Sequence, residues 1–252
     1  MIQTCYKILS RSSLILALGL MLPGLVSHST GQAGGVRPVL APSTRRPPDA
    51  PPPPPPELPP NAASVTPLTL QALIELRPVQ GKALTIRQSI SRTADRIHVS
   101  GDDGSEWLFE RNPRDARRVT GVRIERTSGQ LVVHEESELR NVLGVRGWAD
   151  VLMLGFDRNL LDGLERTEET QTVGGIRFAR YSPVRKDLRV QDVWWSDDQL
   201  LAKAFVLADD TGTSRFSIER INPDVSTQLI QHPSLRFPAY RLVDFPDWLD
   251  SR

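Results

Sequence analysis

Three pairs of adjacent aspartates are the side chains most able to bind a metal ion or to serve as an acid and a base. Each pair lies in a polar stretch between apolar segments, where aspartate is common because its side chain hydrogen-bonds the nearby backbone. None fits the calcium-loop pattern of alternating oxygen ligands followed by a distant glutamate. We therefore interpret them as hairpin-turn residues: Asp102 and Asp103, Asp197 and Asp198, Asp209 and Asp210.

The histidines are too dispersed along the chain to indicate a metal site. His98, His134 and His232 have no metal-ligand spacing, and His28 lies in the N-terminal segment. His98 and His134 are out of phase with the apolar residues beside them. Because successive strand residues point to opposite faces, we expect both on the polar face of a sheet, in surface or structural roles.

No pattern in the chain indicates an enzyme. There is no nucleophile elbow, no phosphate-binding glycine loop before a helix, and no zinc-protease motif. Gly174 and Gly175 precede a strand and therefore predict a turn. We predict a noncatalytic protein with no metal, cofactor or catalytic residue. The alternative is a hydrolase whose site gathers His98 or His134 with an acid and a serine from distant positions.

Large apolar residues on both faces of several segments are more informative. Residues 107–109 (WLF), 193–195 (VWW) and 204–207 (AFVL) alternate sides in a strand, so one-sided burial cannot cover them all. Helices or a second sheet packed on each side of the sheet would be enough to cover both faces. We favour a curved sheet with helices inside it and an apolar cavity for a lipid or acyl chain. The predicted cavity residues are Trp107, Phe109, Phe178, Trp195 and Phe205.

Short alternating segments separated by turn residues predict an antiparallel sheet, so the fold class is mainly β with a few helices. Helical spacing of apolar residues predicts an opening helix over 68–76. A second helical region is expected from Ser137, as a cap, through Leu143, resuming over 148–154. The predicted strands are 83–91, 96–100, 105–111, 118–127, 130–135, 164–173, 176–182, 190–196, 200–209 and 213–221.

The first 33 residues have the layout of a cleavable signal peptide. Lys7 and Arg11 precede an apolar run over 14–26, and small residues follow. An uncleaved membrane anchor is the alternative, but the run is shorter than the roughly 20 residues of a spanning helix. Cleavage would remove the only cysteine, Cys5, and deliver a periplasmic or otherwise exported protein without a transmembrane anchor.

A proline-rich segment, residues 34–60, separates the signal peptide from the domain predicted over 61–252. Twelve of the 21 prolines lie between Arg37 and Pro60, where they favour extended polyproline II and disfavour helix and sheet. We interpret the segment as a disordered linker, with a peptide ligand for an aromatic groove as the alternative. Acids and bases alternate and nearly balance beyond it, which argues against nucleic acid as a partner.

From residue 68 to residue 240 the chain resembles the periplasmic lipoprotein-carrier superfamily of LolA-, LolB- and RseB-like domains. The resemblance lies in the opening helix, strand 105–111 with 130–133 (QLVV), the interrupting helices, and the closing segments 192–201 (DVWWSDDQLL), 209–213 (DDTGT) and 236–238 (RFP). It implies an open half-barrel around helices that encloses a hydrophobic site. The tail from Asp244 to Trp248 and the long linker depart from the simplest carriers.

We therefore expect an envelope protein that binds a hydrophobic ligand, either a lipid or a lipoprotein acyl chain. The first alternative is a protein-interaction or stress-sensing scaffold that binds another envelope protein through an edge strand or the proline linker. The second alternative is the hydrolase with a dispersed site.

Overall fold

The alternation of apolar and polar residues produces a large β-sheet. The computed structural model describes residues 54–185, 189–210 and 212–251. Its strands there are β1 (Leu68–Pro78), β2 (Leu84–Arg92), β3 (Arg96–Gly101), β4 (Glu106–Arg111), β5 (Val119–Glu125), β6 (Gln130–His134), β7 (Leu164–Val173), β8 (Ile176–Pro183), β9 (Val190–Ser196), β10 (Leu201–Asp209), β11 (Gly212–Asn222) and β12 (Arg241–Asp244). Its helices are η2 (Ala62–Ser64), α3 (Glu136–Leu143), α4 (Trp148–Leu152), η3 (Arg158–Gly163), α5 (Pro233–Arg236) and α6 (Phe245–Asp250).

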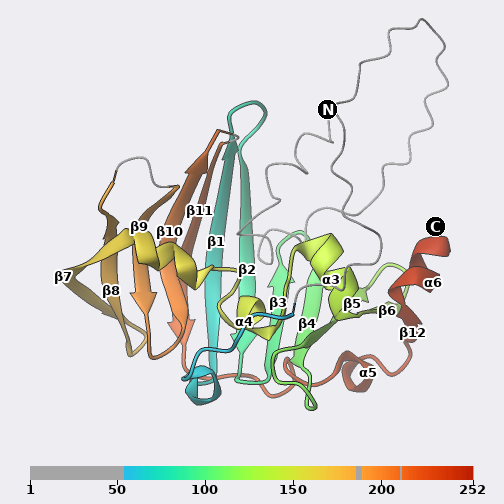
Figure 1. Ribbon diagram of the computed structural model, residues 1–252. Coiled ribbons are helices and arrows are strands. Elements are labelled where there is room, and N and C mark those ends of the chain that lie inside the picture. Colours follow the sequence, from blue (N-terminus) through green and yellow to red (C-terminus); the bar gives the residue numbers. More distant parts are fainter. Residues whose placement is uncertain (1–53, 186–188, 211, 252) are drawn as a thin grey trace, which may run out of the picture. The chain divides into compact units, whose positions relative to one another are not determined.

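All of these strands belong to one curved, open sheet (Figure 1). Its order is β12-β6-β5-β4-β3-β2-β1-β11-β10-β9-β8-β7, so β12 and β7 are its two edges. Neighbouring strands are antiparallel, except that β12 runs parallel to β6. The predicted fold class, an open antiparallel half-barrel with few helices, is therefore confirmed, and strands β2 to β11 match their predicted ranges to within two residues.

The predicted helix over 68–76 is wrong, because these residues form β1 in the middle of the sheet. Burial alternates along the strand, with Leu68, Leu70, Ala72 and Ile74 all buried on one face. Leu73, on the other face, forms a spacing with Leu70 and Ile74 that is also compatible with a helix. The period of two prevails because β1 pairs along its length with both β2 and β11.

One face of the sheet is covered by residues 136–163, which connect β6 to β7 and which we call the strap (Figure 1). The strap contains α3, α4 and η3. Helix α3 begins with a capping box between Glu135 and Glu138, so the predicted cap Ser137 is wrong by two residues. It ends at Gly144, whose left-handed backbone (φ 70°) suits glycine. Both predicted helical stretches are thus present.

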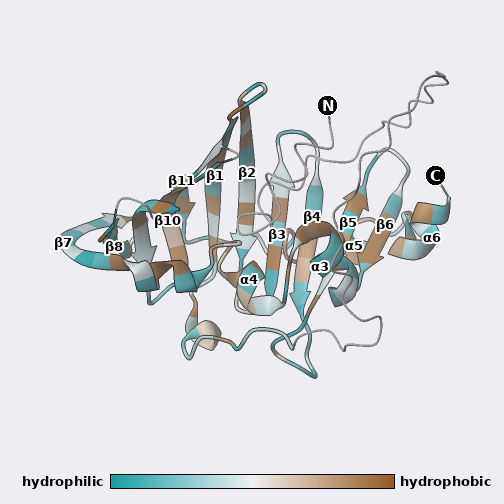
Figure 2. Ribbon diagram, turned by 45° about the horizontal axis from the view of Figure 1, so that its top comes forward, coloured by the Kyte–Doolittle hydropathy of each residue, from teal (hydrophilic) through white to brown (hydrophobic). Residues whose placement is uncertain are grey.

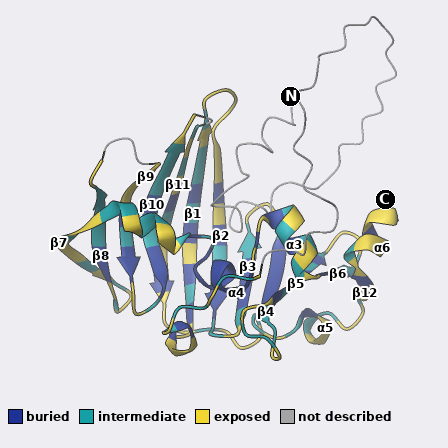
Figure 3. Cartoon of the chain, viewed as in Figure 1, coloured by how far each residue is buried: buried dark blue, intermediate teal, exposed yellow. Residues whose placement is uncertain are grey.

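The opposite, outer face of β4 to β6 is covered by the chain after β11. Phe237 and Tyr240 pack there on Val122, Ile124 and Leu131. After Tyr240 the chain forms β12, which pairs with β6 at the edge of the sheet. Helix α6 follows on the strap side, where its Phe245 contacts His134. The apolar segment 107–109 is therefore buried on both of its faces. Figures 2 and 3 show the hydropathy and the burial of strand β4, which contains it.

The predicted signal peptide, 1–33, and most of the predicted linker, 34–53, lie outside the described residues. The end of the linker segment packs on the domain, because Leu58 contacts the core. A side-chain carbon on Gly147 would approach Pro55 and Pro56 closely. Within the described ranges, no helix has the length and apolar character to span a bilayer.

Candidate functional site

The face beneath the strap carries a cluster of aromatic rings. Phe156, which follows α4, lies between two of the predicted cavity residues, with ring centroids 5.2 Å from Trp195 and 5.1 Å from Phe205. Phe205 stacks in turn on Phe216 at 5.2 Å. All four side chains are buried. The strap therefore inserts one aromatic ring at the place where the sequence predicts an apolar ligand.

The other predicted cavity residues lie elsewhere in the same core. Trp107 and Phe109 are two residues apart on β4, and their rings stack at 5.6 Å with an interplanar angle of 3°. Phe178 is fully buried in β8. The structure thus places all five predicted residues in one core cluster. Four of them belong to two groups of rings: Trp195 and Phe205 around Phe156, and Trp107 with Phe109 on β4. Their role as ligand contacts stays a prediction.

A buried arginine fastens the strap to the sheet. Arg92, at the end of β2, donates from Nη1 to the Leu152 carbonyl (3.1 Å) and the Leu200 carbonyl (3.3 Å), and from Nη2 to the Gln199 carbonyl (2.8 Å). Its side chain is 0% exposed. Burial lowers the pKa of Arg92 to about 10, so the guanidinium is still charged at neutral pH. It joins the end of α4 to the β9–β10 turn.

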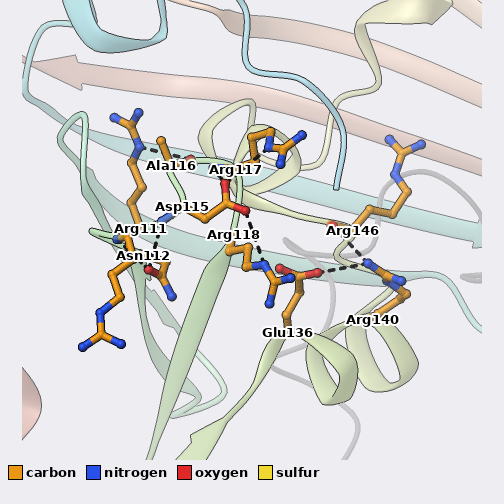
Figure 4. A network of polar contacts seen from close by, with 10 residues as sticks. Arg111, Asn112, Asp115, Ala116, Arg117, Arg118, Glu136, Arg140 and Arg146 are labelled. Atoms are coloured by element: carbon orange, nitrogen blue, oxygen red, sulfur yellow. Dashed lines mark hydrogen bonds and ion pairs between the residues drawn. The ribbon is translucent and has the colours of Figure 1, made fainter. Parts of the chain in front are cut away.

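A polar network holds the beginning of the strap (Figure 4). The Trp148 backbone N–H donates to the Arg117 carbonyl in the β4–β5 loop at 2.7 Å. Arg140 donates to Glu136 at 3.1 Å and to the Arg146 carbonyl at 3.5 Å. Trp148 is fully buried, and the side chains of the Arg140–Glu136 ion pair are only 20% and 17% exposed. The strap before Phe156 is therefore held by two buried side chains, Arg92 and Trp148, and the Trp148 Nε1 donates to the Ala94 carbonyl at 3.1 Å.

The face on which Phe156 packs continues beyond that ring as a half-exposed apolar row. Register places Leu84, Leu76, Ser214, Leu207 and Val190 side by side across β2, β1, β11, β10 and β9. Leu76 and Leu207 are each two residues beyond Ile74 and Phe205, so they share the face of the aromatic cluster. Leu84 is 38% exposed, Leu76 and Leu207 are partly buried, and Val190 is buried. Ser214, between Leu76 and Leu207, is the one polar member and is half-buried. We call these five residues the apolar row, after its four apolar members.

Both strand histidines are buried, so the predicted surface role is wrong and the structural role remains. His98 lies on the outer face, where its Nε2 is 2.8 Å from Glu106 Oε1. Burial alone would raise the pKa of Glu106, but hydrogen bonds from His98 and Arg126 and the charge of Arg236 outweigh it and lower this pKa to about 2. These contacts fix the C-terminal segment, which supplies Arg236, to the sheet.

The strand pairings from β3 to β6 place His98, Leu108, Val122 and Val133 side by side on the outer face. His134 follows Val133 in β6 and therefore lies on the opposite face, on the strap side. The two histidines therefore lie on opposite faces of the sheet and do not share a site. The His134 ring is 5.0 Å from Trp107 and 4.5 Å from Phe245. Neither ring nitrogen has a hydrogen-bond partner among the described residues.

Replacing His134 with phenylalanine is expected to remove part of the acid sensitivity of the fold. Burial, with the nearby charge of Arg123, lowers the pKa of His134 to about 4 from 6.5. The unfolded chain therefore binds this proton more readily, and stability falls as the pH drops from 6.5 to 4, by about 3 kcal/mol. Urea unfolding of His134→Phe should lack this loss, while His232→Phe, at a half-exposed histidine, should retain it. Equal pH dependence in both variants would refute the assignment.

The aspartate pairs form turns, as predicted. Asp103 Oδ1 accepts from the Ser105 backbone at 3.0 Å, and Asp209 Oδ1 accepts from Gly212 at 3.2 Å. In the turn after Asp197, however, the residue with positive φ is Leu200 (47°), not an aspartate. The described ranges contain no group of three or more acidic, histidine or cysteine side chains arranged to hold a metal ion.

Sequence reasoning missed two residues of this site, Phe156 and Arg92. Arg92 follows Ile86, Gln88 and Ile90 at a spacing of two, and all four are buried, so strand alternation was an available signal. Phe156 lies outside regular structure between a glycine and an aspartate, where no periodicity marks it.

Comparison with known proteins found similarity in three-dimensional structure alone. Neither protein-family models nor curated proteins gave a match. Similar solved structures include an uncharacterized conserved protein from Thermus thermophilus, with 10% identity, TM-score 0.40, and coverage of 73% of this chain and 92% of the other. A LolA superfamily protein from Nitrosomonas europaea has 8% identity, TM-score 0.35, and coverage of 69% and 95%. The Pseudomonas aeruginosa MucA/MucB complex has 16% identity, TM-score 0.39, and coverage of 69% and 58%.

Proposed function

We propose that this protein binds a single acyl chain of a lipid or lipoprotein on the strap side of its half-barrel, as a noncatalytic protein of the cell envelope. The observation that supports this most is the apolar row, which extends the aromatic cluster into half-exposed surface. In this proposal residues 1–33 direct export to the periplasm and are removed. Residues 34–60 then link the domain, 61–252, to its point of attachment.

The length of the apolar row suits an acyl chain. Five strands spaced about 4.8 Å apart give a row about 19 Å long. A bilayer core is about 30 Å thick and holds two layers of chains, so one chain reaches about 15 Å. An extended chain lying across the strands would contact Leu84, Leu76 and Leu207 with its apolar length. Its polar head would remain in water beyond Leu84, the most exposed of these leucines.

Phe156 is the part of the protein that would yield to a longer or deeper chain. Its ring fills the space between Trp195 and Phe205 with carbon, which an acyl chain can replace without breaking a hydrogen bond. Trp195, by contrast, donates from Nε1 to Asp197 Oδ1 at 2.9 Å and is fixed to its turn. We therefore expect the strap, rather than the sheet, to move when the site fills.

Titration with a fluorescent fatty acid tests the proposal. Leu76→Glu and Leu207→Glu each place a carboxylate in the row, where a bound chain would desolvate it, so affinity should fall by about tenfold or more. Leu84→Glu, at the exposed end, should weaken binding less. Each variant is first checked for wild-type unfolding.

The matched control is Leu242→Glu, because Leu242 is 56% exposed on β12 at the far edge of the sheet. It makes the same chemical change and should leave affinity as in wild type. If all four variants bind equally well, or if the wild-type protein takes up no fatty acid, the row is not the binding site.

A further inference from the structure

A second concave site lies at the opposite end of the sheet, where β1 begins and β11 ends. It is a groove of about 260 Å³ between the β7–β8 turn and the β9–β10 turn. Leu68, Ile176 and Ile221 line it with apolar carbon, and Thr66, Arg177 and Asp198 add polar groups. None of these residues belongs to the apolar row. The groove is therefore distinct from the proposed acyl-chain site, and a binding role for it can be tested independently of that proposal.

The groove occurs where two neighbouring strands of the sheet separate. β8 and β9 pair only at Ala179, Arg180 and Tyr181, although both strands continue toward the groove. On its other side β8 remains paired with β7 as far as Ile176. Within a strand, backbone groups point alternately to the two neighbours. Ile176 pairs with Val173 across the tight turn and Phe178 is fully buried, so the backbone N–H and C=O groups that point toward the groove are those of Arg177. They form a short open strand edge next to an apolar floor.

The floor is closed by close packing of the β7–β8 turn. Gly174 has φ 56°, and a side-chain carbon on it would lie 2.7 Å from the Ile221 Cβ. Only glycine allows this approach, so the turn fits against β11 at a fixed distance. The apolar floor is therefore built into the hairpin geometry.

Charges of both signs lie among the polar groups that line the groove. Arg177 and Asp198 are exposed, and no ion pair joins either of them to another residue in the described ranges. A ligand that carries both donors and acceptors would complement this lining better than an anion or a cation alone. A peptide main chain has that character at every residue.

From these observations we propose that the groove binds an extended segment of a protein partner, which pairs with the open edge of β8 and places one apolar side chain on the floor. Strand addition to an exposed edge is a common mode of peptide recognition. The volume also favours this occupant over a whole small molecule, because pockets for drug-sized ligands measure about 300–1,000 Å³. One medium-sized side chain with its backbone suits the smaller space.

The test uses the full chain without its signal peptide and two blocked heptapeptides of threonine, one with a central leucine and one with a central aspartate. We expect the leucine peptide to bind with a dissociation constant below about 1 mM and to shift the NMR amide signals of residues 176–178 and 196–199. The aspartate peptide should bind at least about tenfold more weakly, because the floor is apolar.

Two variants locate the binding. Thr66→Trp fills the groove from an exposed position, and Arg177→Glu reverses one charge of the lining, so each should weaken the leucine peptide at least about fivefold. Arg114→Glu, an exposed arginine in the β4–β5 loop, makes the same charge change elsewhere and should have no effect. Failure of the leucine peptide to shift these amides, or binding that persists in Thr66→Trp, would overturn the proposal.

Discussion

Arg92→Ala should lower the free energy of unfolding by about 3 kcal/mol and loosen the strap. The change leaves the carbonyls of Leu152, Leu200 and Gln199 without their donor, and an unsatisfied buried acceptor costs about 1–3 kcal/mol. Relief from burying a charge offsets part of this loss, because burial disfavours the guanidinium, as its lowered pKa shows. Urea unfolding and hydrogen exchange of residues 148–154 measure the two effects.

Arg87→Ala is the matched control, since Arg87 lies on the same strand with an exposed side chain. It should change stability by less than about 0.5 kcal/mol. Arg92→Met keeps the aliphatic length without the charge, so it should fall between the two. If Arg92→Ala and Arg87→Ala unfold alike, Arg92 does not anchor the strap.

Phe156→Ala is expected to have the second large effect, and it links stability to binding. Removing a buried phenylalanine leaves a cavity between Trp195 and Phe205 and should cost about 3–5 kcal/mol. The same variant should bind a fatty acid more tightly than wild type. This gain is expected for a fatty acid longer than the apolar row, because in wild type the Phe156 ring must withdraw before such a chain can enter between Trp195 and Phe205, and this reduces apparent affinity by the fraction of open molecules.

Phe156→Leu, which keeps most of the apolar volume, should lose less stability and gain less affinity. Saturating fatty acid should also raise the unfolding midpoint of Phe156→Ala more than that of wild type. An alanine variant that is destabilised but binds no more tightly would show that Phe156 supports the core without obstructing the ligand.

The sheet was predictable from sequence because period-two alternation and turn residues are local signals. β7 matches its predicted range, and Gly129, Gly174 and Gly175 have the positive φ angles that their turns require. The opening segment failed because Leu73 made a helical spacing compatible with the same residues. Pairing with β2 and with β11, which lies more than a hundred residues later, decides for a strand.

The site was less predictable because its parts meet through tertiary contacts. The five predicted aromatics are buried together, but no local pattern indicates that Phe156 lies between two of them. His134 was expected on a polar face, and α6, from the chain terminus, contributes Phe245 to bury it. The strands that carry these residues were predicted correctly. The segments that cover them, the strap and α6, are distant in sequence, and their effect on burial was therefore not predictable.

Native mass spectrometry of the protein with a series of fatty acids tests the central claim most directly. We predict one bound acid per chain, with affinity rising as the chain lengthens, because each buried methylene contributes about 0.8 kcal/mol until the row is filled. Leu207→Glu should lose this adduct and Leu242→Glu should keep it. Absence of a bound acid at every chain length, or adducts that do not depend on length, would contradict acyl-chain binding on the strap side of the half-barrel.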